Sequence, residues 1–394
     1  MEKLLYISTG IPKEEVDALR AKQFDFSSNA LLPISVFHGN LLTGLADAYD
    51  EVEALCGVPI SRKLFRVLRY SAKKIKKGNI RYNIPGFFNL PVVKQLTTTV
   101  KLFWYILAWC VKNRKHDCRI MIDGTFYTGL MSLALASKIY HVKTCALFVD
   151  YYSFMDPVQS TTEQKRFYKL LDCIDSFVFV TEYLQELVNR DHRPYMIMEG
   201  LVDGQVRASA PAQLRNDCVY AGGLHKIYGV ENLVDAFHAS DLPYEMHFYG
   251  NGELVDYIKE VSEKDPRIQY KGILSHDNLL ELERGAKLLL NPRPVYGELD
   301  TRFNFPSKLM EYMQSARPVL TTRLLGIPEE YNDYMYFFED DTKEAIQRGL
   351  EKVLSLDEKE LEKFACNARD FVNQNKNNGF IGRKIHDFMN MEGK

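Results

Sequence analysis

The chain has 394 residues, of which 46% are hydrophobic and 26% are charged, and its net charge is −2. This length exceeds one typical domain and suits two, each able to bury a hydrophobic core. The seven cysteines are scattered without a CxxC pair, which argues against a disulfide framework or a zinc cage and fits a reducing cytosol. The longest apolar run, 102–111, falls short of the roughly 20 residues that span a membrane, and the start of the chain predicts a strand rather than a signal peptide.

Charge is distributed unevenly along the chain. Residues 1–205 contain 26 Lys and Arg against 21 Asp and Glu, a balance of +5, whereas the remainder contains 24 against 31, a balance of −7. Between residues 54 and 116 there are fourteen basic residues and no acidic one. Apolar residues interleave with the bases there, which favours a helix or loop on an anionic membrane surface. A solvated protein face and a nucleic-acid contact are the alternatives, but no nucleic-acid-binding motif accompanies the bases.

Short apolar segments alternate with helical patterns in the first half of the chain. This alternation predicts a parallel sheet with helices on both of its faces. We expect strands at 3–9, 119–122, 144–149 and 177–180. We expect helices at about 60–77, 92–115, 127–139, 162–172 and 182–190.

The alternation begins again near Cys218. Strands are expected at 218–221, 246–249, 268–270, 287–290 and 318–321, with helices at about 230–239, 253–263, 276–284, 307–315, 342–354 and from 357 onward. The small, polar segment 207–216 predicts a linker, so we expect domains at 1–205 and 206–375 and a C-terminal helix at 376–394 that packs back on the first domain. Ligands of doubly wound sheets bind at the carboxyl ends of the strands, which places the expected site in a cleft between the domains.

Three segments of the second half carry the most specific pattern. They are YAGGLHKIYGVENLVDAF (220–237), HFYGNGEL (247–254) and FPSKLMEYMQSARPVLTT (305–322). In order and spacing they resemble glycosyltransferase family 4, whose third segment has the pattern P-x-K-x-x-E-x-(M/L)-A-x-G-x-P-V. The resemblance is strong over about 215–325 and weak in the first half. It implies the GT-B fold, an α/β architecture of two Rossmann-like doubly wound domains that face a central cleft.

The third segment also has chemistry of its own. Pro306 can occupy the first position of a helix, where its missing N–H has no cost. Lys308 and Glu311 then share a face near an N-terminus whose free N–H groups suit a diphosphate. Lys308 can add a positive charge there, and the resemblance implies that Glu311 binds two ribose hydroxyls. A surface salt bridge between the two side chains is the alternative interpretation.

The resemblance implies further residues of the donor site. These are Gly222, Gly223, Lys226, Gly250, Asn251, Gly252, Ile273, Arg302, Asn304, Phe305, Pro306 and Ser307. The chain departs from the family where a first glutamate is usual, because Phe303 stands eight positions before Glu311. Glu298 or Asp300 could take over its contact with the sugar, and Arg302 could pair with phosphate or with these acids. The family's phosphate-binding Arg and Lys near the first glycine turn are replaced by Gly223 and Tyr228, which leaves Lys226 as the nearest substitute.

Candidate residues in the first half are fewer. Asp123 and Asp150 each follow a predicted strand, where a carboxylate could orient or deprotonate an acceptor hydroxyl, although helix capping is the alternative role. No nearby histidine forms a convincing pair with either one. His38 and Asn40 are predicted to lie in another loop of acceptor contacts.

The resulting prediction is a glycosyltransferase that moves a hexose from a UDP- or GDP-sugar to a growing surface polysaccharide such as capsule, exopolysaccharide or lipopolysaccharide. The resemblance implies retention at the anomeric carbon. No Asp-x-Asp motif is present, so we expect neither a metal nor another cofactor. The bases and Phe103-Trp104-Tyr105 suggest a lipid-linked acceptor and a cytoplasmic enzyme peripheral to the inner membrane face, although 100–111 reads more simply as a buried helix. A catalytically silent nucleotide- or glycan-binding subunit and a GT-B-fold epimerase are the alternative functions.

Overall fold

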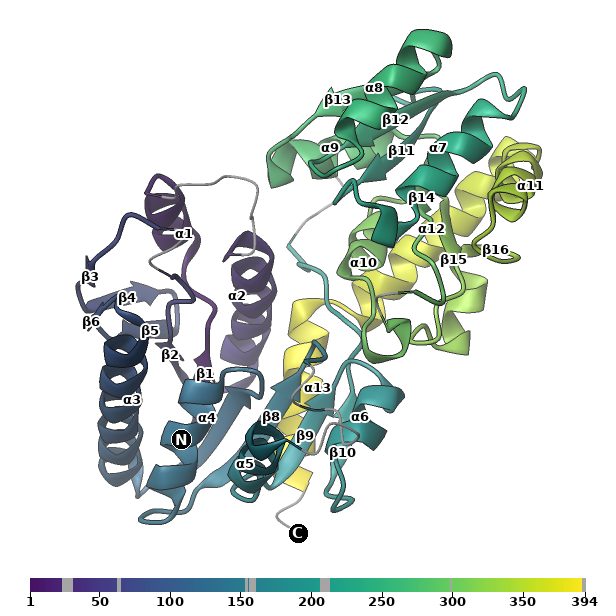
Figure 1. The fold of residues 1–394 in the computed structure, drawn as a ribbon. Helices are drawn as coiled ribbons and strands as arrows, with labels where there is room; N and C mark the ends of the chain where they lie inside the picture. The colour runs from purple at the N-terminus through teal and green to yellow at the C-terminus, as the bar shows by residue number, and fades with distance from the viewer. Residues whose placement is uncertain are drawn as a thin grey trace. The chain divides into compact units, whose positions relative to one another are not determined.

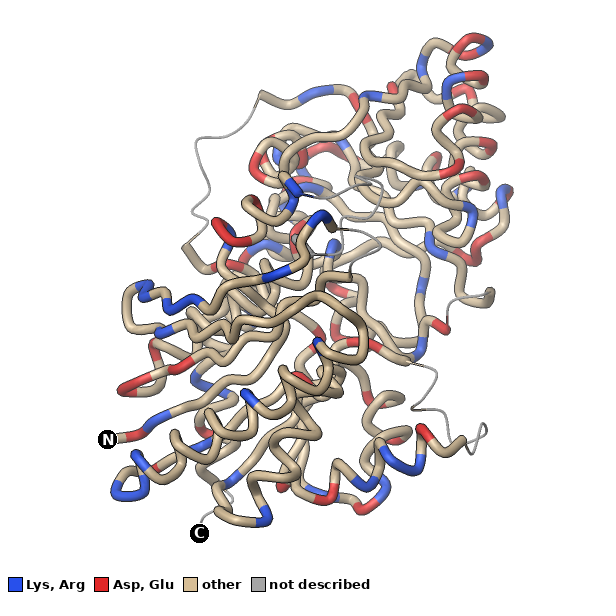
Figure 2. The backbone as a smooth tube through the Cα atoms, turned by 60° about the vertical axis from the view of Figure 1, so that its left-hand side comes forward, with Lys and Arg blue, Asp and Glu red and all other residues tan. Residues whose placement is uncertain are grey.

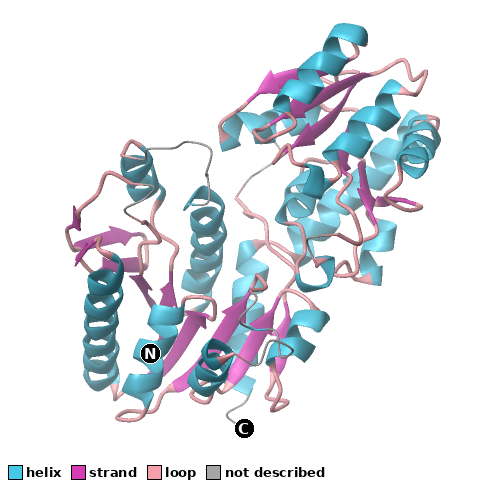
Figure 3. Ribbon diagram, in the orientation of Figure 1, coloured by secondary structure: helices cyan, strands magenta, loops and turns pink. Residues whose placement is uncertain are grey.

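The structure is a computed structural model of the chain, and it describes residues 1–22, 31–61, 65–152, 155, 161–205, 213–297 and 300–391. The chain forms two compact units, called here the N-terminal unit (Met1–Leu201 with Asn378–Lys394) and the C-terminal unit (Val202–Asn377). Each unit contains its own parallel sheet with flanking helices (Figures 1 and 3). The unit boundaries lie a few residues from the expected ones, and residues 206–212 of the expected linker lie outside the described part of the chain.

The sheet of the N-terminal unit has eight strands in the order β10-β9-β8-β7-β1-β2-β5-β4. All neighbours run parallel except β4, which is antiparallel to β5. The bounds are β1 (Glu2–Ser8), β2 (Glu51–Cys56), β4 (Lys73–Lys77), β5 (Ile80–Ile84), β7 (Asp117–Asp123), β8 (Lys143–Phe148), β9 (Ser176–Phe179) and β10 (Tyr195–Ile197). Strand β1 lies between β7 and β2, and four of its consecutive side chains are fully buried. Burial on both faces explains why the expected strands appear in the sequence as continuous apolar runs.

Helices cover this sheet, and a small antiparallel pair, β3 (Arg69–Tyr70) and β6 (Phe87–Phe88), accompanies them. The helices are α1 (Lys13–Arg20), α2 (Leu31–Ala48), α3 (Pro91–Asn113), α4 (Tyr127–Ser137), α5 (Thr162–Leu171), α6 (Glu182–Val188) and α13 (Asn378–Met391). Helices α2 and α13 pack so closely that a Cβ atom at Gly44 or at Gly382 would collide with the backbone of the other helix. Two glycines at this crossing let the backbones approach.

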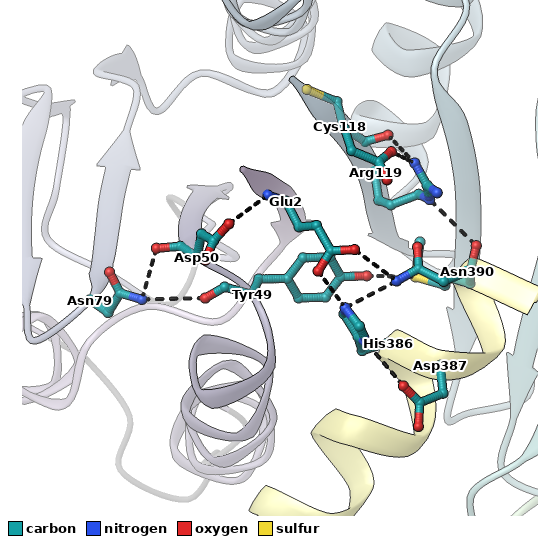
Figure 4. Close-up of polar contacts among 11 residues, drawn as sticks. Glu2, Tyr49, Asp50, Asn79, Cys118, Arg119, His386, Asp387 and Asn390 are labelled. Atoms are coloured by element: carbon teal, nitrogen blue, oxygen red, sulfur yellow. Dashed lines mark hydrogen bonds and ion pairs between the residues drawn. The ribbon is translucent and has the colours of Figure 1, made fainter. Parts of the chain in front are cut away.

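Polar contacts also tie the C-terminal helix α13 to the N-terminal unit (Figure 4). His386 lies 3.0 Å from a carboxylate oxygen of Glu2 and stacks edge-on against Tyr49. Arg119 Nε donates to the carbonyl of Met389. The end of the chain is therefore part of the first unit's core and not an appendage of the second unit.

The expected helix at 60–77 is wrong. Strands β4 and β5 instead form a hairpin whose two-residue turn contains Gly78, with a φ of +54°. On β4, Lys73 pairs with Glu15 at 2.6 Å and Lys77 pairs with Glu14 at 2.6 Å, both from α1. The intervening Lys74 and Lys76 are exposed, as the two-residue period of a strand requires. Half of this lysine cluster is therefore neutralised within the protein, and the helix, one of the two forms expected for a membrane-surface segment there, does not form.

The expectation that 100–111 is an ordinary buried helix is correct for one face of α3 only. Leu102, Ile106 and Trp109 are buried, whereas Trp104 is exposed. Among the described residues, no helix combines the length and the apolar character needed to cross a bilayer.

The sheet of the C-terminal unit has six parallel strands in the order β13-β12-β11-β14-β15-β16. The bounds are β11 (Asp217–Ala221), β12 (Glu245–Tyr249), β13 (Ile268–Gly272), β14 (Leu288–Asn291), β15 (Val319–Thr322) and β16 (Tyr336–Phe338). Numbered from the first strand of the unit, this is the 3-2-1-4-5-6 order of the doubly wound Rossmann fold. In this order strands 2 and 3 extend the sheet to one side of strand 1, and strands 4 to 6 extend it to the other side. The expected strands of this half are thus confirmed, and β16 is added to them.

The helices of the C-terminal unit also match the expected ones within a few residues. They are α7 (Val230–His238), α8 (Val255–Lys264), α9 (His276–Gly285), α10 (Ser307–Gln314), α11 (Lys343–Leu354) and α12 (Glu358–Asn375), with short 3-10 turns at Lys226–Tyr228, Thr301–Phe303 and Glu329–Asp333. Leu309, Met310 and Met313 of α10 are buried, so the opposite side of that helix is left for Lys308 and Glu311.

Candidate active site

The residues predicted for donor binding lie near the switch point of the C-terminal sheet, between β11 and β14, where the strand order reverses. Gly222 follows β11, Arg293 follows β14, and α10 begins beside them at Ser307. In an open α/β sheet this switch point leaves a crevice at the carboxyl ends of the strands. The fold therefore presents the loops of three elements at the one place where such sheets bind ligands.

The side chain of Lys308 lies directly against the turn after β11. Its Nζ is 5.0 Å from the ring centroid of Tyr220, and a Cβ atom added at Gly222 would collide with it. Gly222 leaves space for the ammonium group of Lys308 beside the end of β11. Burial lowers the pKa of Lys308 to about 8, while the carboxylates of Glu283 and Glu311 act in the opposite direction.

The two predicted glycine segments pack against each other. Gly222 N donates to Tyr249 O, and Gly250 N donates to Gly272 O. Gly250 has a φ of +137°, and a Cβ atom there would collide with the carbonyl of Gly222. Gly252 is equally close to the backbone of Leu224, whose N–H donates to Asn251 O. Only glycine permits this close contact between the two loops that follow β11 and β12.

Glu311 is half-buried one turn along α10 from Lys308. His276, the first residue of α9, places Nε2 3.9 Å from Oε1 of Glu311. Burial raises the pKa of Glu311, and His276 and Lys308 oppose that rise. The carboxylate is thus held near two positive or titratable partners, and it does not form the simple surface salt bridge that was the alternative interpretation.

Sequence reasoning missed three residues of this cluster. Arg293 stacks its guanidinium 5.0 Å from the ring centroid of Tyr228, donates to Asn304 Oδ1 at 3.1 Å, and is close enough to lower the pKa of Lys308. Its place directly after a buried strand was the signal that could have identified it. Glu283 of α9 is fully buried, and burial raises its pKa. Nothing in the sequence distinguished Glu283 or His276 from ordinary helix residues.

Other predicted donor residues have partners within the protein. Lys226 pairs with Glu231 at 2.9 Å on the surface, and Arg302 forms a bidentate pair with Asp300, at 2.9 and 2.6 Å. Arg302 thus contacts one of the acids that were considered for it, while Glu298 lies outside the described residues. Phe303 is buried rather than facing a ligand.

The remaining predicted residues line the same region with different exposure. Phe305 is buried against Tyr331, and Ile273 is exposed after β13. Pro306 lies one residue before α10, so the first helical position expected for it is taken by Ser307, which is exposed. Gly223 lies between Tyr228 and His225. No side chain caps the N-terminus of α10, so its backbone N–H groups add to the positive field of Lys308 and Arg293. The combination suits a polyanion such as a diphosphate.

The N-terminal unit contains a buried polar chain at its own switch point, between β1 and β7. His38 Nδ1 lies 2.6 Å from the hydroxyl of Tyr6, and His38 Nε2 lies 3.4 Å from Asp123 Oδ2. The other carboxylate oxygen of Asp123 accepts from the N–H and the hydroxyl of Thr125. The hydrogen bonds from His38 and Thr125 lower the pKa of Asp123 against the opposing effect of its burial.

This arrangement corrects two expectations. A histidine does pair with Asp123, and both His38 and Asn40 lie on helix α2 and not in a loop. His38 lies 85 residues from Asp123 in the sequence, so no local pattern could have revealed the pair. Asp123 also forms the local contacts to Thr125 that its alternative capping role predicts. Asp150 is exposed after β8.

A pocket of about 360 Å³ opens at the carboxyl ends of β1 and β2. It is lined by Thr9, Gly57 and Val58 after these strands, by Lys94 and Thr98 of α3, and by Phe126 before α4. Lys94 donates to the carbonyls of Val58 and Ile60 at 2.8 and 2.6 Å, and burial lowers its pKa to about 8. Within the described part of the chain, no cluster of three or more His, Cys, Asp or Glu side chains could hold a metal ion.

Comparison with known proteins gives a family match over part of the chain and a shared fold over all of it. Residues 215–355 match the family of glycosyl transferases group 1. Sucrose-phosphate synthase from Thermosynechococcus elongatus is similar in structure, with a TM-score of 0.67 at 12% identity over 100% of this chain and 99% of that one. HepE from Anabaena, in complex with UDP, has a TM-score of 0.62 at 14% identity, covering 99% and 100% of the two chains.

The lipopolysaccharide outer core galactosyltransferase WaaB has a TM-score of 0.62 at 12% identity, with 99% of each chain covered. These solved structures have the GT-B fold, so the expected fold class is confirmed over the full chain. No curated protein sequence matches the chain.

Proposed function

We propose that this chain, which has the GT-B fold and matches the glycosyl transferases group 1 over residues 215–355, transfers a hexose from a UDP- or GDP-sugar to a growing glycan. The observation that carries the proposal is the approach of Lys308 to Gly222 at the switch point of the C-terminal sheet. The half-buried ammonium group of Lys308 lies near the carboxylates of Glu283 and Glu311, and a nucleoside diphosphate would give it a further negatively charged partner.

The same crevice offers partners for the rest of the donor. The N-terminus of α10, Lys308 and Arg293 face one region and would bind the diphosphate. Glu311 would accept hydrogen bonds from the ribose hydroxyls, and the Gly250–Gly252 backbone would lie beside the base. HepE, a GT-B protein of the same length class, is described in complexes with UDP and with UDP-glucose, which supports this donor class.

The reaction proposed is transfer with retention. The bond between the anomeric carbon and the diphosphate oxygen breaks, and a bond to the acceptor oxygen forms on the same face of the sugar. The acceptor proton passes to the leaving phosphate, whose charge Lys308 and the helix N–H groups stabilise. This route needs no metal or other cofactor.

The acceptor is proposed to bind to the N-terminal unit. Asp123, held by His38 and Thr125, and the pocket beside Lys94 both lie at the carboxyl edge of that sheet. We propose a lipid-linked glycan of a surface polysaccharide as the acceptor, handled on the cytoplasmic face of the membrane. The excess of positive charge between residues 54 and 116 supports an acceptor held at an anionic surface.

The donor assignment is tested by calorimetric titration with UDP, GDP, ADP and their sugars. Wild type is compared with Glu311→Ala and with Glu281→Ala, a matched exposed glutamate of the same unit. We expect one nucleotide to bind wild type and Glu281→Ala equally, and Glu311→Ala about tenfold or more weakly, since hydrogen bonds to a charged group contribute roughly 1.5–3 kcal/mol. If no nucleotide binds to wild type, the proposal is wrong.

A further inference from the structure

Helix α3 carries an exposed apolar surface that the donor and acceptor sites do not use. Of the twenty large apolar side chains that are exposed in the described part of the chain, nine fall between residues 68 and 111. They are Leu68, Phe88, Leu90, Val92, Val93, Leu96, Val100, Trp104 and Val111, and they are called here the α3 surface. Soluble monomers rarely leave so many apolar side chains together in water, so this surface needs a partner.

The spacing of these residues forms a continuous stripe. Val92, Leu96, Val100 and Trp104 follow one another at intervals of four, which places them on one face of the 23-residue helix. Val92 is 75% exposed, Leu96 65% and Trp104 61%. The opposite face is packed into the unit through Leu102, Ile106 and Trp109. Helix α3 thus has two apolar faces. One is packed into the N-terminal unit, and the other is exposed to solvent.

The stretch that contains this surface has charges of a single sign, although Glu14, Glu15 and Glu53 from outside it pair with Lys77, Lys73 and Arg81. No acidic residue occurs from 54 to 116, and Figure 2 marks the basic and acidic residues of the described chain along its backbone. Lys101 and Lys112 of α3 are exposed beside the stripe, and Arg69 lies over the ring of Phe88 with 5.7 Å between Cζ and the ring centroid. Arg114 and Lys115 are exposed just beyond the end of α3. An anionic partner with an apolar interior is complementary to this pattern.

We propose that the α3 surface is embedded in the interfacial layer of an anionic lipid bilayer, with the helix lying in the plane of the membrane. Apolar side chains would enter the boundary between headgroups and acyl chains, and the bases would meet anionic headgroups. A second copy of the chain is a poorer partner, because a symmetric contact would bring the like charges of two α3 helices together. This inference rests on the proposed lipid-linked acceptor and names the element that brings the enzyme to it.

The position of the pocket strengthens the link between this surface and the acceptor. The first two turns of α3 contribute Pro91, Lys94, Gln95 and Thr98 to the lining of the 360 Å³ pocket. Val92 and Leu96 lie between these residues in the sequence, and their side chains are exposed on the adjacent face of the helix. With α3 in the bilayer interface, the pocket at its N-terminal end would lie beside the lipid headgroups. An amphiphile in the outer part of the bilayer would therefore be able to reach this pocket.

The test measures partition to vesicles of equal parts phosphatidylcholine and phosphatidylglycerol, and to vesicles of phosphatidylcholine alone. The variant replaces Val92, Leu96, Val100 and Trp104 with glutamine, and its control is Met391→Gln, an equally exposed apolar residue on α13. Circular dichroism and nucleotide binding check that the variant is folded. We expect wild type and Met391→Gln to bind the anionic vesicles and the α3 variant to bind about tenfold or more weakly, because interfacial binding scales with buried apolar area.

Fluorescence gives an independent readout, because the chain has only two tryptophans and Trp109 is buried. Anionic vesicles should shift the emission of wild type to shorter wavelength, and Trp104→Phe should abolish the shift while most of the binding persists. Equal vesicle binding by wild type and the α3 variant would overturn the inference, as would an absence of binding by wild type. A dimer that the α3 variant dissociates, with no vesicle binding, would assign the surface to a second copy instead. In each case intact nucleotide binding would show that the donor proposal stands.

Discussion

The two units have related architectures, yet their candidate sites are built in different ways. In the C-terminal unit, Lys308 and Glu311 are neighbours on one helix, and Gly222, which lies against Lys308, is in a short loop. In the N-terminal unit, Tyr6, His38 and Asp123 come from β1, α2 and the end of β7, separated by 32 and 85 residues. A site made of one helix and its adjoining turns leaves a sequence pattern, whereas a site assembled by tertiary packing does not.

The difference extends to the surroundings of each site. The cationic groups of the C-terminal site are held in a crevice beside backbone that only glycine can form. The polar chain of the N-terminal unit is itself buried and satisfied, so it positions Asp123 and its loop more than it offers free groups. We therefore expect substitutions in the first site to impair ligand binding, and substitutions in the second to impair stability.

The largest effect is expected for Lys308→Ala. Loss of a charge that stabilises the leaving diphosphate should lower turnover by about 10²–10³-fold, in line with the removal of a single transition-state donor. The melting temperature should change little, because the half-buried ammonium group costs desolvation in the free protein. Steady-state kinetics with the donor sugar identified by titration measures this, and unchanged turnover would remove Lys308 from the reaction.

His38→Ala should show the opposite profile. It leaves the ionised carboxylate of Asp123 buried without its partner, which costs about 3 kcal/mol or more. Chemical denaturation measures the loss, and Tyr6→Phe, which removes one hydrogen bond, should cost about 1 kcal/mol. Nucleotide affinity of the folded His38→Ala protein should equal that of wild type. A large fall in nucleotide affinity would contradict the separation of the two sites.

Gly222→Ala tests the close approach of Lys308. The added methyl group would displace Nζ from the end of β11, and we expect nucleotide affinity to fall about tenfold, or roughly 1.4 kcal/mol. Gly297→Ala is the matched control, because nothing lies within 4 Å of a Cβ atom at that position. Equal nucleotide affinity of the two variants would show that Lys308 need not lie at the end of β11 for nucleotide binding.

The lowered pKa of Lys308 predicts a pH dependence for nucleotide binding. The protonated ammonium binds the diphosphate, so with a pKa of about 8 its population falls roughly tenfold between pH 7 and pH 9. Affinity should decline over that range in wild type. In Lys308→Arg the charge persists, and the profile should be flat if the side chain fits. A flat wild-type profile would show that the ammonium stays charged throughout.

The smallest effect is expected for Lys226→Ala. The side chain is exposed and paired with Glu231, and surface pairs contribute about 0–1 kcal/mol. Stability and nucleotide affinity should both stay close to wild type. A tenfold loss of affinity, measured by the same titration, would show that Lys226 leaves Glu231 to bind the donor and replaces the missing family residues.

The amino-acid sequence by itself indicated the architecture and predicted the donor residues of the C-terminal unit. Buried strands appear as apolar runs, and helices appear through their 3.6-residue period, so half of the strands of the first sheet, most of those of the second sheet and helix α10 with Lys308 could be placed from local pattern. The helix predicted at 60–77 is wrong because Lys73–Lys77 forms a strand that ends at the two-residue turn Gly78-Asn79, and it is this turn, not the lysine pattern, that indicates a hairpin.

Tertiary structure alone decided which charges remain available and which faces remain exposed. Glu14 and Glu15 neutralise two lysines of β4 from a helix some sixty residues earlier, His38 reaches Asp123 across the sheet, and α3 buries one apolar face while leaving the other in solvent. None of these outcomes follows from local sequence, because each depends on which neighbour the packed chain brings to a side chain. Propensity and pattern act over a few residues, whereas pairing and burial are set by contacts between distant ones.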